Sequence, residues 1–292
     1  MRAAIAGAAV AAALAVAAGG CGSSSSTTVS KGASGASGAS GAAGVSTPKT
    51  TGQVRLAFEK PQTKQDAVGA FLLRKAGTAH IAQLLATNFK LPNPLTVKGV
   101  NGIGSGPFYS PKDNSITLPY SFAAIVLQVL EQSNPRWSQH QVGFAAGAVE
   151  DFFLEHEFGH ALIANYNLPI LGNEEDAADQ IATVLFLNSP EGPHLAAQAA
   201  QFFSDFSGRQ NPPVLADYAD VHALDLQRAD DILCDAAGSS RLAFRQVGAL
   251  GLLPRSRLAQ CPSEYAQAVK SFKQLLQPKL HQAIHLRPPL SN

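Results

Sequence analysis

Two histidines four residues apart, with a glutamate directly after the first, are the residues of this sequence whose types and spacing point most directly to chemistry. They are His156, Glu157 and His160. On a helix, residues i and i+4 lie on one face, so both imidazoles can reach one metal ion at about 2.0–2.1 Å. The glutamate then lies beside the ion, where it can act as general base for an attacking water. The motif predicts a zinc-dependent hydrolase.

The residues around the motif favour a helix with a buried side. No proline occurs in residues 144–166, and apolar side chains recur at helical spacing. The stripe consists of Val149, Phe152, Phe153, His156, His160 and Ile163. Both imidazoles are therefore expected to face inward, where a shared metal ion would satisfy them. A pair of hydrogen-bonded core histidines is the alternative interpretation.

An acidic segment downstream supplies the candidates for a third ligand. It reads Gly172-Asn-Glu-Glu-Asp-Ala-Ala-Asp179 and begins another helix, with Asn173 as a plausible N-cap. Acids in a first turn can simply match the helix dipole. Glu175 and Asp179 are also one turn apart, so one can bind the ion while the other takes the free N–H of a ligating histidine.

The segment from Glu175 to Asp179 resembles the signature of glutamate, two residues, alanine and aspartate that follows the active-site helix in several glutamate-zincin peptidases. The resemblance implies that His156, His160 and Glu175 bind zinc and that Glu157 is the base. It also implies that Asp179 orients a histidine. Peptide hydrolysis is the reaction that it implies.

A longer stretch, residues 71–276, resembles a bacterial family of proposed metallopeptidases of unknown function. The matching features are Phe108-Tyr-Ser-Pro111 before residues 116–118, the run 222–228, and the cysteines Cys234 and Cys261. In zincins, a strand just before the active-site helix commonly forms the edge of the cleft and pairs with extended substrate. The resemblance makes residues 116–118 the candidate for this strand. An ordinary strand inside the sheet is the alternative.

Two assignments stay open at the site. Glu174 could replace Glu175 as the third ligand. A zinc peptidase also needs a donor for the oxyanion, and His222 or Arg228, which we predict on one helix about two turns apart, could supply it. A structural polar pair is the alternative for these two residues, and Tyr218 is a weaker candidate for the donor.

The start of the chain predicts export. Met1-Arg2, an alanine-rich apolar run and Gly19-Gly-Cys21 resemble a lipoprotein signal peptide at 1–20, with Cys21 as the lipidated residue. We therefore expect an extracytoplasmic protein anchored to the bacterial cell membrane. An ordinary secretory signal, giving a secreted or periplasmic protein, is the alternative. Residues 21–53, rich in Ser, Gly and Ala, predict a flexible linker before one domain at 54–292.

The remaining cysteines and the charge agree with this location. Once Cys21 is assigned to lipid, Cys234 and Cys261 can form a disulfide, which needs an oxidising compartment; two buried free thiols are the alternative. The net charge is +1, and the lysines and arginines are scattered. Nothing in this pattern suggests a nucleic-acid partner.

The periodicity predicts an α+β fold that is mostly helical, with a small antiparallel or mixed sheet before the active-site helix. Expected helices are 65–89, 122–131, 144–166, 194–207, 217–237 and 263–276, and expected strands are 106–109 and 115–118, joined by a turn at 111–115.

The motif thus predicts a zinc-dependent hydrolase, and the resemblance implies that it is a peptidase acting on a peptide or protein substrate. Other zinc amidases could use the same ligands. The alternative is a non-catalytic zinc-holding lipoprotein that serves as a binding or scaffold module. Glu157 favours the enzyme, because a binding site has no need of a base beside an open coordination position. His281 and His285 repeat the histidine spacing with glutamine in place of the base, and we interpret them as non-catalytic.

Overall fold

The computed structural model describes residues 49–51, 54–102, 104–210 and 212–291. The predicted signal peptide, Cys21 and most of the predicted linker lie outside these residues. The end of the predicted linker is described, and there Lys49–Thr51 form strand β1, which pairs with β2. The sheet therefore begins a few residues before the domain boundary that the composition predicts.

A mixed sheet precedes the helix that carries His156 and His160, as predicted. Among the described residues its strands are β1 Lys49–Thr51, β2 Val54–Phe58, β3 Leu95–Val100, β4 Phe108–Ser110 and β5 Ser115–Pro119, in the order β1-β2-β3-β5-β4. Strands β2, β3 and β5 are parallel, and β1 and β4 pair antiparallel at the two ends.

Strand β5 lies inside the sheet, and every one of its residues is buried. Its Ile116 pairs with Val97 of β3 on one side and with Tyr109 of β4 on the other. The prediction that residues 116–118 form a free edge for substrate is therefore wrong, because both edges of β5 are already paired. Within the described residues the two edge strands are β1 and β4, and β4 is the one next to β5.

The rest of the described chain is helical. The helices are α1 Lys64–Ala76, α2 Thr78–Asn88, α3 Tyr120–Ser133, α4 Gln139–Tyr166, α5 Glu174–Leu187, α6 Gly192–Ser207, α7 Leu215–Tyr218, α8 Asp225–Ser239, α9 Arg241–Leu250, α10 Arg255–Leu258 and α11 Cys261–Leu275. Two predicted helices are interrupted. Helix 65–89 breaks at Gly77, whose φ of 83° favours glycine, and helix 217–237 breaks at residues 219–224.

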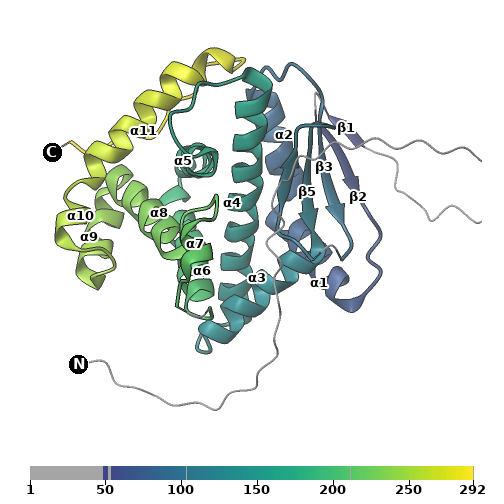
Figure 1. The fold of residues 1–292 in the computed structure, drawn as a ribbon, viewed down its shortest axis with the longest axis horizontal. Helices are drawn as coiled ribbons and strands as arrows, with labels where there is room; N and C mark the ends of the chain where they lie inside the picture. Colours follow the sequence, from purple (N-terminus) through teal and green to yellow (C-terminus); the bar gives the residue numbers. More distant parts are fainter. Residues whose placement is uncertain (1–48, 52–53, 103, 211, 292) are drawn as a thin grey trace, which may run out of the picture. The chain divides into compact units, whose positions relative to one another are not determined.

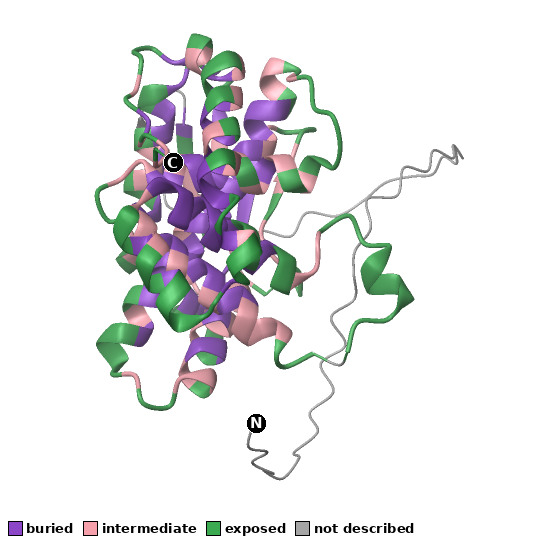
Figure 2. Cartoon of the chain, turned by 90° about the vertical axis from the view of Figure 1, so that its left-hand side faces the viewer, coloured by how far each residue is buried: buried purple, intermediate pink, exposed green. Residues whose placement is uncertain are grey.

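Helix α4 is the central element of the fold. It runs for 28 residues from the capping box of Ser138 and Gln141 to Asn167, which ends it in the left-handed conformation. The sheet and α1–α3 lie on one side of α4, and α5, α6 and α8 lie on the other (Figure 1). Because both sides are covered, the helix is buried almost throughout its length, which Figure 2 shows as the purple interior.

The C-terminal helices are held together by a disulfide and by the chain end. Cys234 of α8 is bonded to Cys261 of α11, as predicted, with 4.9 Å between the Cα atoms. The Arg287 guanidinium donates to the backbone carbonyls of Leu187, the last residue of α5, and of Ser189, at 2.7 Å each. Within the described residues, no helix combines the length and the apolar character that crossing a bilayer requires.

Candidate metal centre

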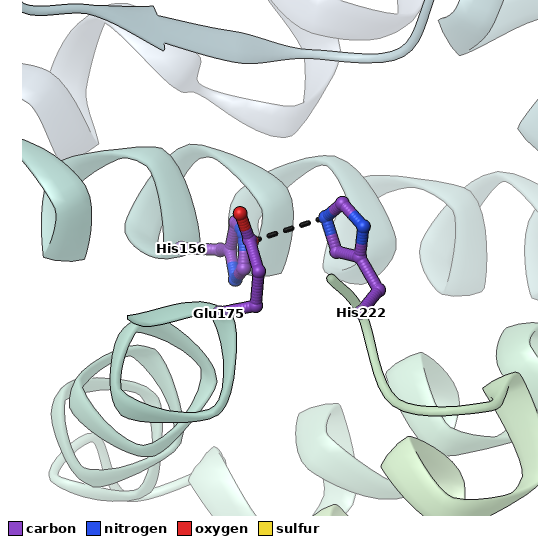
Figure 3. Close-up of side chains that lie close together, drawn as sticks. All are labelled: His156, Glu175 and His222. Atoms are coloured by element: carbon purple, nitrogen blue, oxygen red, sulfur yellow. Dashed lines mark ion pairs between the residues drawn. The ribbon is translucent and has the colours of Figure 1, made fainter. Parts of the chain in front are cut away.

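Four side chains from three segments converge beside α4. His156 and His160 come from α4, Glu175 from the first turn of α5, and His222 from the segment before α8 (Figure 3 draws three of the four). The Glu175 Oε2 atom lies 3.2 Å from His156 Nε2, 3.1 Å from His160 Nε2 and 3.0 Å from His222 Nε2. The Nε2 atoms of His156 and His160 are 3.2 Å apart.

This arrangement fits a transition-metal ion. Bonds of about 2.0–2.1 Å in tetrahedral geometry separate ligand atoms by roughly 3.3 Å. The mutual distances of His156, His160 and Glu175, which run from 3.1 to 3.2 Å, agree with that value. A ligand atom from each of His156, Glu175 and His222 also lies within 4.8 Å of the other two. Imidazole and carboxylate together are donors that suit zinc.

The close contact between α4 and α5 brings the glutamate to the histidines. A Cβ atom added at Gly159 would lie 3.0 Å from the backbone oxygen of Ala178 and 3.1 Å from its Cα. Glycine therefore lets the two helix backbones approach beside the motif. The Asn173 side chain accepts from the Glu175 N–H as N-cap, and its amide donates to the Val221 carbonyl. The same residue thus begins α5 and joins it to the segment that carries His222.

A second layer of polar contacts orients His156. Its Nδ1 atom lies 2.7 Å from Asp179 Oδ1, and Arg228 donates to the two Asp179 oxygens at 2.7 and 2.8 Å. The guanidinium carbon of Arg228 lies 4.3 Å from the centre of the Phe203 ring. This pairing holds the His156 tautomer with Nδ1–H toward Asp179 and Nε2 free for an ion.

Glu174 and Glu175 occupy different sides of His160. Glu175 faces Nε2, whereas Glu174 Oε1 lies 2.9 Å from Nδ1 on the opposite side of the ring. In this geometry Glu174 is placed to orient His160 as Asp179 orients His156. From the sequence, Glu174 was predicted only as an alternative ligand. The signal for the orienting role is that two adjacent acids at a helix start must point in different directions.

Electrostatics favour a cation at the centre. Burial raises the pKa values of Glu175 and Asp179. At Glu175 this effect is outweighed by hydrogen bonds with histidines, and at Asp179 by Arg228. Both pKa values therefore lie well below the usual range. Burial lowers the pKa of His156, but its bonds to the same two carboxylates outweigh burial and raise it to about 9. The carboxylates are therefore ionised and hold positive charge between them.

Glu157 lies next to these ligands. Its Oε1 atom is 4.0 Å from His156 Nε2, and its side chain is buried. Burial raises the pKa of Glu157, and the neighbouring histidines only partly offset this effect. The backbone of Tyr109 in β4 also hydrogen-bonds to Glu157, so the edge strand of the sheet borders the general-base candidate.

His222 reaches the site from a segment that was predicted to be helical. That prediction is wrong, because residues 219–224 separate α7 from α8 and only Arg228 lies on a helix. The Asp220 carboxylate accepts from the His222 backbone N–H at 2.8 Å and lies 3.0 Å from Nδ1. Aspartate bonding to the backbone two residues on competes with helix formation, and the Asp-x-His spacing is the signal that could have indicated it.

The other candidates lie elsewhere. Tyr218 is 67% exposed in the short helix α7, and the structure gives it no described contact with the centre. His281 and His285 are exposed in the C-terminal tail, which is not helical there, so they do not form a helical pair.

Comparison with known proteins agrees with the geometry. The family model described as "Putative metallopeptidase" matches residues 58–276, from the end of β2 to just beyond α11. The match takes in all four converging side chains and the base candidate. No curated protein and no solved structure matches the chain. Because the family model covers well over half of the sequence, the chain belongs to the family described as "Putative metallopeptidase".

Proposed function

We propose that the chain is a zinc-dependent peptidase in which Glu157 is the general base. The observation that carries the proposal is the position of this buried carboxylate, 4.0 Å from a histidine Nε2 that itself faces Glu175. A site that only holds metal has no use for a further buried carboxylate beside its ligands, because burying such a group without function costs stability.

The ligands and the base have distinct roles. His156, His160 and Glu175 would hold the ion, and zinc in this position supplies a Lewis acid that polarises the substrate carbonyl and makes water more acidic. Glu157 takes the proton of the attacking water and passes it to the leaving amine. Its raised pKa suits both halves of this task, since the group must accept a proton and then release it.

His222 is the proposed donor to the oxyanion of the tetrahedral intermediate. Its Nε2 atom points toward the same centre, and its side chain is 44% exposed on the open side of the site. Asp220 fixes the ring through Nδ1, so that Nε2 faces the reacting group. Arg228 is engaged by Asp179, so its contacts support a positioning role through His156 rather than direct contact with substrate.

An extended peptide is the proposed substrate. Strand β4 has a free edge within the described residues, and its Tyr109 backbone already contacts Glu157. A peptide that adds as a strand to β4 would place its backbone across the centre. This reassigns to β4 the role that the sequence had suggested for residues 116–118.

Anchoring through Cys21 is part of the proposal. The support is the sequence of the first twenty-one residues and the disulfide between Cys234 and Cys261, a bond that persists in oxidising compartments. The proposed location is extracytoplasmic, on the cell membrane. Mass spectrometry of the protein from membranes tests it, because an unmodified Cys21 would contradict it.

Substitution Glu157→Gln tests the proposed reaction. We expect hydrolysis of a broad peptide library to fall by about 10²–10⁴-fold, because the amide cannot accept the proton. Zinc content by elemental analysis should stay at the wild-type level, and Glu191→Gln, at an exposed position, should leave hydrolysis unchanged. Zinc binding with no hydrolysis by the wild type itself would instead favour the scaffold function.

A further inference from the structure

The α9–α10 hairpin, residues 240–260, lies beyond α8 on the side of the fold away from the sheet (Figure 1). Its inner side packs through Ala243, Val247, Leu253 and Leu258, which are buried. Its outer side carries large apolar side chains as well. Leu242 is 59% exposed, Leu250 71% and Leu252 49%. Three exposed leucines within eleven residues form an apolar surface that the fold itself does not use.

The same hairpin is strongly basic. Arg241, Arg245 and Arg255 are exposed and make no ion pair with any described residue. Arg257 is the exception, because it binds Asp231 and Glu264. No aspartate or glutamate occurs in residues 236–263. The three exposed arginines therefore lie near the exposed leucines without an acidic partner among the described residues.

This combination distinguishes the hairpin from the exposed apolar segment that precedes α8. Val214, Leu215 and Val221 are also exposed, but Asp217 and Asp220 lie among them. An anionic surface would repel that segment and attract the hairpin. Amphipathic elements that bind anionic bilayers combine exposed basic and apolar side chains in this way. The basic groups meet the headgroups, and the apolar side chains reach the boundary with the acyl chains.

We propose that the α9–α10 hairpin docks on anionic phospholipid membranes, with its arginines against the headgroups and its leucines inserted between them. The docking surface is separate from the metal centre and does not depend on the proposed peptidase activity. It is also independent of the proposed lipid on Cys21, although the two would act together, since one weak attachment alone gives only reversible binding.

A tryptophan placed in the hairpin tests the proposal. In the full-length chain, Cys21→Ala removes the proposed lipidation site and Trp137→Phe removes the native tryptophan. To this background we add Leu250→Trp in the hairpin or, as the matched control, Leu84→Trp in α2. Leu84 is 47% exposed and lies on a different helix. Vesicles of phosphatidylcholine with or without phosphatidylglycerol contain brominated acyl chains, which quench only a tryptophan that enters the bilayer.

We expect strong quenching of the tryptophan at position 250 in vesicles with phosphatidylglycerol, and little quenching at position 84. Adding Arg241→Gln and Arg245→Gln should raise the lipid concentration for half-maximal quenching by about 25-fold, or about fivefold for each charge. Equal quenching at both positions, or quenching that does not depend on phosphatidylglycerol, would overturn the proposal. So would an unchanged lipid requirement in the arginine variant, if its circular dichroism matches the parent.

Discussion

At the scale of single residues, the candidate metal centre includes side chains that hold its histidines from the side opposite the metal-facing nitrogens. Asp179 and Glu174 each face the Nδ1 atom of a histidine, and Arg228 holds Asp179 through two hydrogen bonds. Such outer contacts fix the histidine tautomers and increase ligand basicity. The contacts that order the candidate centre therefore come from α4, α5 and α8.

Substitution Arg228→Met should weaken zinc binding by about 10–100-fold, because Asp179 would lose the partner that holds it against His156. Methionine keeps part of the packing against Phe203. The zinc dissociation constant, measured by competition with a chromophoric chelator, checks this result. Arg136→Met, at an exposed arginine, is the control, and an equal constant for both variants would show that Arg228 has no positioning role.

Glu150 makes stability depend on pH. It is buried in α4, its Oε1 atom has no hydrogen-bond partner among the described residues, and burial, with a smaller effect of Asp151, raises its pKa to about 8. In the unfolded chain the same group has its ordinary pKa of 4.5. Between these two values the folded state binds more protons, so the free energy of unfolding falls as pH rises.

Glu150→Gln should therefore be more stable than the wild type above pH 8, by on the order of 5 kcal/mol, and show little difference near pH 4.5. The glutamine keeps the shape and removes the charge. Urea unfolding at pH 5 and pH 8.5 measures the effect. A stability difference that does not grow with pH would mean that Glu150 is ionised in the folded protein.

At the scale of elements, the site is formed where α4 and α5 touch. Gly159 allows this contact, and the N-cap Asn173 sets where α5 begins, so Glu175 meets the histidines in its first turn. Strand β4 supplies the opposite border through the Tyr109 backbone. The helix pair and the edge strand together define where a substrate backbone would pass.

Gly159→Ala should destabilise the protein by about 1–3 kcal/mol, because its Cβ would lie 3.0 Å from the Ala178 oxygen and push α5 away. Zinc binding should weaken as well, since Glu175 moves with α5. Gly143→Ala is a matched control on the same helix, where an added Cβ meets nothing within 4 Å. That change should stabilise by roughly 0.5–1 kcal/mol. Thermal unfolding with and without zinc measures both variants, and equal effects would contradict the close-contact argument.

At the scale of the whole molecule, distant segments are joined near the C-terminus. The disulfide joins α8 to α11. In the C-terminal tail, the Leu290 N–H donates to the Gly238 carbonyl of α8, and Arg287 donates to the carbonyl of Leu187 at the end of α5. Because α8 also carries Arg228, these connections help to hold Arg228 in position against Asp179.

Replacing both Cys234 and Cys261 by alanine should lower the free energy of unfolding by about 3–4 kcal/mol, the value expected for a bond that spans 27 residues. Urea unfolding of the oxidised wild type, the reduced wild type and the double variant provides the measurement. Reduction should have no effect on the double variant. Equal midpoints for all three samples would show that the bond does not contribute to stability.

The helix that carries His156 and His160, its inward histidines, the disulfide and the mostly helical α+β class could all be predicted, because each depends on local spacing or on residue type. Helix geometry alone places His156 and His160 on one face, and Glu175 and Asp179 one turn apart. These relations hold wherever the helix lies in the fold. The sequence by itself therefore determined the histidine pair, the neighbouring glutamate and the acidic segment from which a third donor comes.

Only the tertiary structure decided which strand has a free edge, which nitrogen of His160 each glutamate faces, and that His222 lies outside a helix. Strand order depends on pairings between residues far apart in the chain, and β5 is enclosed because β3 and β4 both pair with it. Glu174 and Glu175 are adjacent acids that only the contact of α5 with α4 distinguishes. His222 reaches Glu175 because Asn173 binds the Val221 carbonyl, a contact across 48 residues that no local pattern contains.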